Sequence, residues 1–413
     1  MNHGRLPFRL AATLLCAACV YPSAGAQTAR PATGASDGVV KLGVLTDMSG
    51  PFSDFSGNGS VSAVRMAVAD FGGKVLGKPI EVVYADHQNK TDVGANLARE
   101  WYEKSKVDAI FDISNSGVAL AVMNVTRDQN KVVVLGGVSN TRVTTDACTP
   151  NSIQYVYDAN ALSNVVAKAL LSQGADSWYF LTVDFAFGHG LEKTTADVVK
   201  AAGGTVVGAV RHPLNTTDFS SYLLRAQSSG AKVIALASGG SDTTNAIKGA
   251  REFGVGSDGR QRVASLLTFI SDVHAMGLAQ AQGVQLTEAF YWDANDDSRK
   301  WARRFFEANK RMPTMVHAGM YSATLHYLKS VQASDTDDAT AVMAKMKSTP
   351  VNDFFARNGH IRSDGLHVHD MYLMDVKKPA ESRYPWDYYN IKATVKGEQA
   401  FSPMVPGACP LVR

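Results

Sequence analysis

The sequence predicts an α/β protein built from two doubly wound lobes. Short, continuously apolar segments alternate with amphipathic helical segments, which is typical of parallel sheets covered by helices on both faces. The alternation runs through two successive series, and one doubly wound sheet seldom takes so many elements. The 413 residues are 45% hydrophobic, which provides apolar mass for two cores.

The elements follow from the apolar pattern in chain order. In the first series we expect strands at 39–45, 79–84, 108–112 and 131–135, and helices at 60–71, 92–105 and 117–129. In the second we expect helices at 160–173, 191–202 and 219–229, and strands at 178–183, 205–210 and 232–237. The last hundred residues predict helices at 298–310 and 316–331, a hairpin at 359–369 turning at Asp364-Gly365, and a final strand at 388–396.

The N-terminus has the three parts of a secretory signal peptide. Residues 1–26 carry Arg5 and Arg9, then an apolar run too short to span a bilayer, then an Ala24-x-Ala26 cleavage sequence. We do not expect a lipoprotein, because the position three before Cys19 is Cys16 where lipid attachment needs leucine. Residues 27–38 are small, polar and contain Pro and Gly, which predicts a disordered leader.

The charge balance is close to neutral. The chain has 41 Lys and Arg against 38 Asp and Glu, and removal of Arg5 and Arg9 with the signal peptide leaves 39 against 38. A nucleic-acid binder needs a basic excess to neutralise phosphates, so this class is not expected. Two cysteines, Cys148 and Cys409, remain after cleavage, and an isolated pair in an exported protein usually forms a disulfide. Two buried free thiols are the alternative.

Sequence motifs of catalysis are missing. The chain has no GxxxxGK[ST] or HExxH and no GxSxG nucleophile elbow between a predicted strand and a predicted helix, and Gly57-Asn58-Gly59 is not completed to a dinucleotide fingerprint. We therefore expect neither an enzyme nor a cofactor. His367 and His369 alternate along one strand and could chelate a metal, but a solvated or hydrogen-bonded pair is the simpler interpretation, and we expect no metal site.

Polar turns follow three predicted strands. Ligands of parallel sheets bind beyond the carboxyl ends of the strands, where hydroxyls and exposed helix N–H groups can hold a carboxylate. With aromatic side chains at Phe55, Phe185 and Phe187, the turns predict a cleft for a small acid with an apolar body. Each turn alone also fits a helix cap. The turns span 113–117, with Ser114, Asn115 and Ser116, 136–140, with Gly137 and Ser139, and 238–242, with Gly239.

Two glycine-containing segments repeat one pattern. Asp-Phe followed by Gly-x-Gly occurs at residues 54–59 and again at residues 184–190, and each segment leads into a helix. We expect these glycines to form tight turns ahead of helices beginning at residues 60 and 191.

Four segments together resemble a known family. They are Val39-x-Lys41-Leu42-Gly43-Val44-Leu45-x-Asp47-x-Ser49-Gly50-Pro51, Ser114-Asn115-Ser116, Gly137-Val138-Ser139-Asn140 and Phe187-Gly188-x-Gly190. From about residue 39 to residue 375 the chain resembles type I periplasmic solute-binding proteins of the Leu/Ile/Val-binding type, the receptors of ABC importers. The resemblance implies two Rossmann-like lobes joined by three crossovers near residues 157–158, 287–290 and 350. The lobes would comprise residues 39–157 plus 288–350 and residues 158–287 plus 351–400, followed by a tail at 401–413.

The resemblance also implies roles for site residues. Ser114, Ser116, Ser139 and the Gly137 backbone would hold a carboxylate, with Asn115 in the same turn. Phe55 and Phe187 would sandwich an aromatic ring, with Phe269 as a third wall. The positions of Phe55 and Phe187 usually carry tyrosine in amino-acid binders, which favours an aromatic acid here. The other implied roles are Asp272 as the partner of an ammonium group, Asp184 as a helix cap or a contact to a ligand hydroxyl, and Gly239 in the third turn.

The tail adds a narrower resemblance. His367-x-His369-Asp370-Met371-Tyr372-Leu373, Tyr384-Pro385-Trp386-Asp387-Tyr388-Tyr389 and Cys409-Pro410-Leu411-Val412 are similar to longer family members associated with uptake of aromatic acids.

The predicted function is that of a monomeric periplasmic receptor that closes around a small, aromatic carboxylate and delivers it to an ABC permease in the inner membrane. The alternatives are a receptor for branched-chain amino acids or amides, a sensor domain of a signalling system, and a secreted hydrolase.

Overall fold

The computed structural model describes residues 1, 4, 33–256 and 259–412, and the described residues from 33 onward belong to one compact unit. The predicted signal peptide, the lipid-attachment position Cys19 and the leader up to residue 32 lie outside the described residues. The end of the predicted leader is ordered, contrary to our expectation. Gly34 N–H donates to the Asp335 carbonyl at 2.8 Å, and Ser36 N–H donates to the Asp337 carboxylate at 2.8 Å, so these residues bind along one edge of the first lobe.

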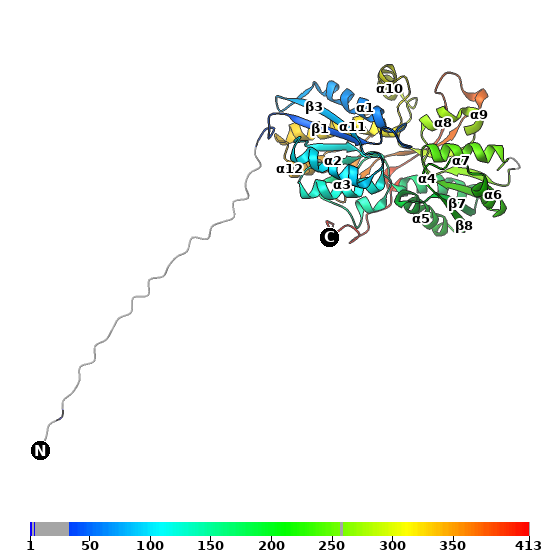
Figure 1. Cartoon of the computed structure of the whole chain (residues 1–413), viewed down its shortest axis with the longest axis horizontal. Helices are drawn as coiled ribbons and strands as arrows, with labels where there is room; N and C mark the ends of the chain where they lie inside the picture. The colour runs from blue at the N-terminus through cyan, green and yellow to red at the C-terminus, as the bar shows by residue number, and fades with distance from the viewer. Residues whose placement is uncertain (2–3, 5–32, 257–258, 413) are drawn as a thin grey trace. The chain divides into compact units, whose positions relative to one another are not determined.

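The first lobe is built on a six-stranded sheet in the order β2-β3-β1-β4-β5-β6 (Figure 1). All neighbouring strands are parallel except the short β2–β3 pair. Helix α1 packs on α11 and α2 packs on α3, and two separate apolar cores lie on the two faces of the sheet. The strands are β1 (Val40–Thr46), β2 (Lys74–Val75), β3 (Lys78–Asp86), β4 (Ala109–Asp112), β5 (Val132–Leu135) and β6 (Ser152–Gln154), and the helices are α1 (Gly57–Phe71), α2 (Thr91–Glu103), α3 (Ser116–Asp128), η1 (Thr141–Thr144), α10 (Asp296–Asn309), α11 (Met315–Ser334) and α12 (Ala339–Ser348).

The second lobe has a seven-stranded sheet in the order β15-β14-β11-β10-β9-β7-β8. Five strands are parallel, and β14 and β15 are added antiparallel at the edge next to β11. The strands are β7 (Ser177–Val183), β8 (Thr205–His212), β9 (Val233–Ala237), β10 (Arg262–Ser265), β11 (Gln285–Glu288), β14 (Met371–Val376) and β15 (Tyr389–Val395), and the helices are α4 (Ala159–Ser172), α5 (Ala186–Ala201), α6 (Ser220–Ser228), α7 (Ser241–Glu252), α8 (Ile270–Met276), α9 (Leu278–Ala281), η2 (Pro379–Glu381) and α13 (Gly397–Ala400).

The predicted fold class is confirmed: two α/β lobes with parallel sheets. The chain passes between elements of the two sheets after β6, after β11 and in the stretch between α12 and β14. The burial of the strands follows their place in the sheet. Every residue of the interior strand β9 is buried, whereas the edge strand β8 alternates between more and less exposed residues along most of its length.

Two helices begin earlier than the sequence predicts. Helix α1 starts at Gly57 instead of residue 60, and α5 starts at Ala186 instead of residue 191. The glycines therefore lie inside the first helical turns, where two of them permit close packing. A Cβ on Gly59 would lie 2.3 Å from Nε2 of His317, and a Cβ on Gly188 would lie 2.1 Å from the Val183 carbonyl oxygen.

The C-terminal elements agree with the sequence prediction. The predicted hairpin forms the antiparallel pair β12 (His360–Ile361) and β13 (His367–Val368), and the predicted last strand is β15. Cys148 and Cys409 form a disulfide, as expected, which ties the tail to the loop between η1 and β6. Within residues 33–256 and 259–412, no helix is both long and apolar enough to cross a membrane.

Candidate functional site

The loop after β1 is organised by one buried carboxylate. Asp47 is fully buried and accepts hydrogen bonds from Gly50 N–H at 2.7 Å, Phe52 N–H at 2.9 Å and Asn89 Nδ2 at 2.6 Å. A carboxylate that is satisfied in this way fixes the course of the surrounding backbone. The loop therefore presents Phe52 and Phe55 from a rigid base.

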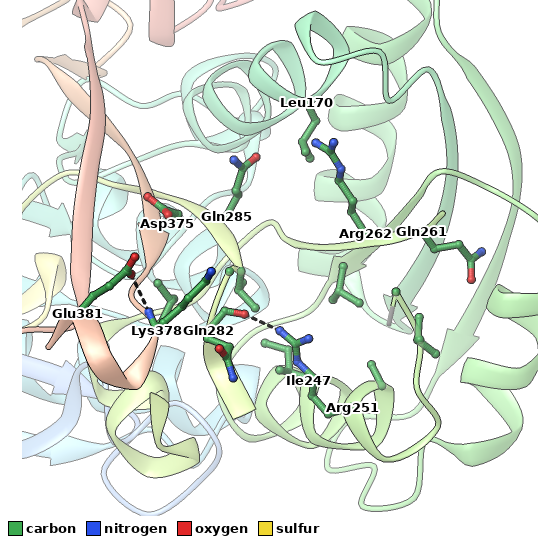
Figure 2. Close-up of a pocket in the computed structure, with 17 residues that line it drawn as sticks. Leu170, Ile247, Arg251, Gln261, Arg262, Gln282, Gln285, Asp375, Lys378 and Glu381 are labelled. Carbon is green, nitrogen blue, oxygen red and sulfur yellow. Dashed lines mark hydrogen bonds between the residues drawn. The ribbon is translucent and has the colours of Figure 1, made fainter. Parts of the chain in front are cut away.

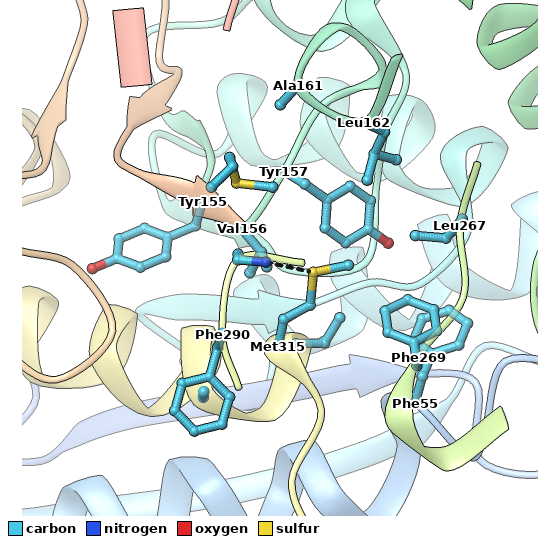
Figure 3. Packing of buried hydrophobic residues seen from close by; sticks show 14 of the residues in the cluster. Phe55, Tyr155, Val156, Tyr157, Ala161, Leu162, Leu267, Phe269, Phe290 and Met315 are labelled. Carbon is cyan, nitrogen blue, oxygen red and sulfur yellow. Dashed lines mark hydrogen bonds between the residues drawn. The ribbon is translucent and has the colours of Figure 1, made fainter. Parts of the chain in front are cut away.

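Phenylalanine rings from the two lobes meet beyond the carboxyl ends of the strands. Phe52 of the first lobe lies 6.4 Å from Phe185 of the second, measured between ring centroids. Phe55 stacks on Phe269 at 4.2 Å with an interplanar angle of 18°, and Figure 3 shows these two rings lying face to face. Phe187 lies 5.7 Å from Phe185 and completes the group.

These rings border a nearly closed cavity of about 10 Å³ between the lobes. One wall is apolar and comes from both lobes, and one edge is polar and comes from the first lobe alone. The lining residues are Phe52, Phe55, Phe185, Phe187 and Leu267 for the wall, and Ser114, Ser116 and Gly137 for the edge. The structure thus brings together six of the residues that the sequence analysis placed at the cleft, Phe55, Ser114, Ser116, Gly137, Phe185 and Phe187.

The polar edge is built from the turn after β4 and the N-terminus of α3. Ser114 Oγ accepts a hydrogen bond from Asp47 N–H at 3.2 Å, which holds the turn against the β1 loop. Asn115 is the N-cap of α3, and its Oδ1 accepts from Gly117 N–H at 2.9 Å and Val118 N–H at 3.1 Å. This corrects the expectation of open helix N–H groups, because Asn115 occupies two of them. Asn115 therefore supports the edge, while the Ser116 side chain lines the cavity.

The second polar turn approaches the cavity mainly through its glycine. A Cβ on Gly137 would lie 2.9 Å from Ser114 Cα and 3.2 Å from Phe55 Cε2, so a side chain here would enter the cavity. Ser139 is buried, and its Oγ has no hydrogen-bond partner among the described residues. It does not line the cavity as the Gly137 backbone does.

The remaining predicted residues lie at greater distance from the cavity. Gly239 stands behind the wall, since a Cβ there would lie 3.3 Å from Leu267 and 3.7 Å from Phe187. Asp184 belongs to an exposed ion cluster, with its carboxylate 2.7 Å from His189 Nε2 and 3.8 Å from Arg211 Nη1.

Asp272 lies in the first turn of α8, next to Phe269. Its Oδ2 accepts from Phe269 N–H at 2.9 Å at the start of α8, and burial raises the pKa of this carboxyl to about 7. It lines a different hollow between the lobes, together with Ser49, Pro51, Asp54, Asn215 and Ser241. The predicted acid and the predicted carboxylate site therefore do not share one cavity.

Sequence reasoning missed two lining residues. Phe52 follows Pro51 in the recognised loop, but only its hydrogen bond to Asp47 turns it toward the second lobe. Leu267 comes two residues after β10, whose sequence Arg-Val-Ala-Ser contains too few apolar residues to predict a buried strand. The rule that ligands bind after parallel strands could have found Leu267 once that strand was known.

The lobes also touch beside the cavity. Gly240, the N-cap of α7, has a φ of +60°, and a Cβ there would lie 2.2 Å from the Pro51 carbonyl oxygen. Only glycine combines this backbone conformation with so close an approach. The β1 loop of the first lobe and the β9–α7 turn of the second are therefore in direct contact.

A further hollow lies at the amino ends of the second lobe's strands, away from the aromatic cavity (Figure 2). Its lining includes the first residues of two strands, Arg262 and Gln285, and several charged side chains such as Arg251, Asp375 and Lys378. Ligands of parallel sheets bind at the carboxyl ends of the strands. We therefore assign the candidate site to the aromatic cavity.

His367 and His369 make hydrogen bonds within the protein. His367 Nδ1 lies 2.9 Å from the Tyr155 carbonyl oxygen, and His369 Nε2 lies 3.0 Å from the Val156 carbonyl oxygen. Burial lowers the pKa of both imidazoles. The described part of the chain contains no group of three or more His, Cys, Asp or Glu side chains placed to hold a metal.

Comparison with known proteins identifies the family. The family model described as periplasmic binding protein matches residues 39–381. The chain belongs to the periplasmic binding protein family. The curated protein "Leu/Ile/Val-binding protein homolog 6" of Brucella melitensis is 27% identical over 358 residues, which are 84% of this chain and 90% of the relative.

Solved structures of this periplasmic binding protein's relatives share its fold. A periplasmic binding protein from Burkholderia mallei is 50% identical, with a TM-score of 0.88 over 91% of this chain and 100% of that chain. A branched chain amino acid ABC transporter periplasmic ligand-binding protein from Burkholderia xenovorans is 42% identical, with a TM-score of 0.81 over 88% and 97%. A solute binding protein from Rhodopseudomonas palustris in complex with p-hydroxybenzoic acid is 22% identical, with a TM-score of 0.79 over 87% and 97%, which shows the fold alone. The resemblance predicted from the four sequence segments is thereby confirmed.

Proposed function

We propose that this periplasmic binding protein captures a small aromatic carboxylate between its lobes and delivers it to the permease of an ABC importer. The observation that carries the proposal is the cavity itself, with four phenylalanine rings and Leu267 on one side and Ser114, Ser116 and Gly137 on the other. A planar ring with one carboxylate matches this division of apolar and polar surface.

The charge of the lining favours an aromatic acid over an amino acid. The lining contains no charged side chain, and the nearest predicted acid, Asp272, faces another hollow. An ammonium group buried without a carboxylate partner would lose its hydration at a cost of several kcal/mol. A carboxylate alone needs only donors, which hydroxyl and backbone N–H groups provide.

Binding would proceed by closure of the two lobes. We propose lobes of residues 39–157 plus 288–350 and residues 158–287 plus 351–400, which rotate about the three crossovers. The rings of the two lobes already meet in this structure, so a ligand ring would enter when the lobes separate, and the lobes would then close over it. Exclusion of water strengthens each hydrogen bond to the carboxylate, and no covalent step is involved. The protein would act in the periplasm as a monomer.

A ligand panel on refolded mature protein tests this proposal. Unfolding and refolding removes carried-over ligand, and a ligand that binds only the folded state raises the melting temperature. We expect benzoate and 4-hydroxybenzoate to raise it, and leucine and valine to leave it unchanged. A shift with leucine or valine and none with the aromatic acids would overturn the proposal in favour of an amino-acid receptor.

A further inference from the structure

The aromatic segment between β14 and β15 does not line the candidate cavity, yet it is tightly packed. Trp386 in this segment is only 6% exposed and has a φ of +70°. A bulky side chain in the left-handed region is strained, so surrounding contacts must hold it there. The contacts of Trp386 therefore identify the part of the structure that this segment supports.

Trp386 packs on the helix that begins next to Phe269, the residue whose ring stacks on the cavity residue Phe55. The Trp386 ring stacks on His274 of α8, with centroids 3.8 Å apart and an interplanar angle of 9°. His274 Nδ1 also lies 2.7 Å from Tyr388 Oη in the same segment. Helix α8 has seven residues, too few to be stable without tertiary contacts, and the residue just before it is Phe269.

The segment is itself locked in place. Lys377 and Asp387 form a buried ion pair, and Asp387 also accepts a hydrogen bond from Arg383 N–H at 3.0 Å. The Trp386 carbonyl accepts from Trp292 Nε1 at 2.9 Å. Trp292 lies in the stretch between β11 and α10, where the chain passes from the second sheet to the first lobe. The segment thus connects that crossover to α8.

We propose that Trp386 is a positioning residue for ligand binding, and that residues 377–388 hold α8 so that Phe269 faces Phe55. The ligand does not touch Trp386; its ring stacks on His274 and fixes the helix whose start places the Phe269 ring at 4.2 Å from Phe55. Because the segment is also bonded to Trp292, rotation of the lobes carries α8 along with the crossover. This inference rests on the proposed function for its effect on affinity, but not for its effect on α8.

The test compares Trp386→Asn with Phe253→Ala. Asparagine tolerates the left-handed backbone conformation and removes only the ring, whereas Phe253 is an exposed aromatic at the end of α7. Hydrogen exchange of the α8 amides, with α6 as internal reference, is followed in both variants. We expect exchange in α8 to be about tenfold faster in Trp386→Asn and unchanged in Phe253→Ala. Unchanged α8 exchange in folded Trp386→Asn would overturn the inference. If that variant does not fold, His274→Ala removes the other half of the stack and must give the same result.

A double-mutant cycle separates positioning from general stability. Benzoate affinity is measured by calorimetry in Trp386→Asn, in Phe269→Ala and in the double variant. If Trp386 acts through Phe269, each single change weakens binding about tenfold and the double variant is no worse than Phe269→Ala. Additive losses would contradict the inference. If the wild-type protein binds neither benzoate nor 4-hydroxybenzoate, the proposed function fails, and the exchange measurement still decides the role of Trp386.

Discussion

The two lobes contribute opposite chemistry to one cavity. The first lobe supplies the polar edge from turns that are themselves fixed by hydrogen bonds, such as the Asn115 cap and the Asp47 loop. The second lobe supplies only apolar side chains, Phe185, Phe187 and Leu267. Helices α5 and α7, which begin at the second lobe's side of the cleft, have no side-chain cap. Under the proposed function, the first lobe would select for the carboxylate and the second for the flat ring.

The largest effect is expected from a substitution that removes the hydrogen bonds holding the β1 loop of the first lobe. Asp47→Ala removes the acceptor of two backbone N–H groups and the Asn89 amide, so buried donors lose their partner. We expect the free energy of unfolding to fall by about 3 kcal/mol, measured in urea. Asp54→Ala is the matched control, because its carboxylate is largely exposed and its pair with Arg311 should contribute less than about 1 kcal/mol. Equal losses in the two variants would contradict a special role for Asp47.

Filling the cavity from the polar edge is expected to abolish most binding. A valine at position 137 would overlap Ser114 and the Phe55 ring, so Gly137→Val should weaken benzoate binding at least about 100-fold by calorimetry. Gly190→Ala is the control, since nothing lies within 4 Å of a Cβ at that helical position. Retention of affinity in Gly137→Val would place the ligand elsewhere.

One substitution in each lobe tests whether the first lobe binds the carboxylate of the ligand and the second binds its ring. Ser116→Ala removes a donor at the polar edge and should weaken benzoate and cyclohexanecarboxylate alike, by about tenfold. Phe187→Leu keeps an apolar wall but loses the flat ring, and should weaken benzoate by about fivefold with little effect on cyclohexanecarboxylate. If both variants changed the two affinities in the same ratio, the lobes would not select different parts of the ligand.

The smallest effect on binding is expected at Asp272. Because this carboxyl faces another hollow, Asp272→Asn should leave benzoate affinity within about twofold. Its effect on stability depends on pH. Burial raises its pKa to about 7, above the value of about 4 in an unfolded chain, so the folded protein binds the extra proton between these values. The stability that this group contributes is therefore present at low pH and falls as pH rises through that window. Asp272→Asn should flatten this fall in urea titrations, and an unchanged profile would contradict the shift.

The strands that the sequence predicts lie closer to their expected positions than the starts of two helices do, whereas β2, β6, β10, β11 and β14 were not predicted. β4 and β5 are short, continuous apolar runs bounded by polar turns, and both lie where the sequence placed them. Helix α1 begins at the first glycine of its Gly-x-Gly segment and α5 begins two residues before its own, although glycines favour turns by local preference. Contacts of Gly59 with His317 decide this, and those residues are far apart in the chain. At these helix starts, tertiary packing outweighs the local preference of the glycines for turns.

Part of the site could also be predicted from the sequence, because some of its residues follow strands that the sequence predicts. Ser114, Ser116 and Gly137 follow apolar strands, so their meeting at one sheet edge follows from parallel topology. The Phe55–Phe269 stack joins the two lobes. Phe55 and Phe269 come from turns far apart in the chain, and no short sequence pattern predicts that they meet.

The sequence by itself determined the α/β class, the two lobes, the polar turns and the cysteine pair, because strand periodicity and turn composition are local properties. Only the tertiary structure decided which aromatic rings share the cavity, that Asn115 is occupied as a cap, and that Asp272 faces a separate hollow. These outcomes depend on where distant segments meet and on which hydrogen bonds they complete there. A residue type and its spacing do not fix the partner that burial will give it.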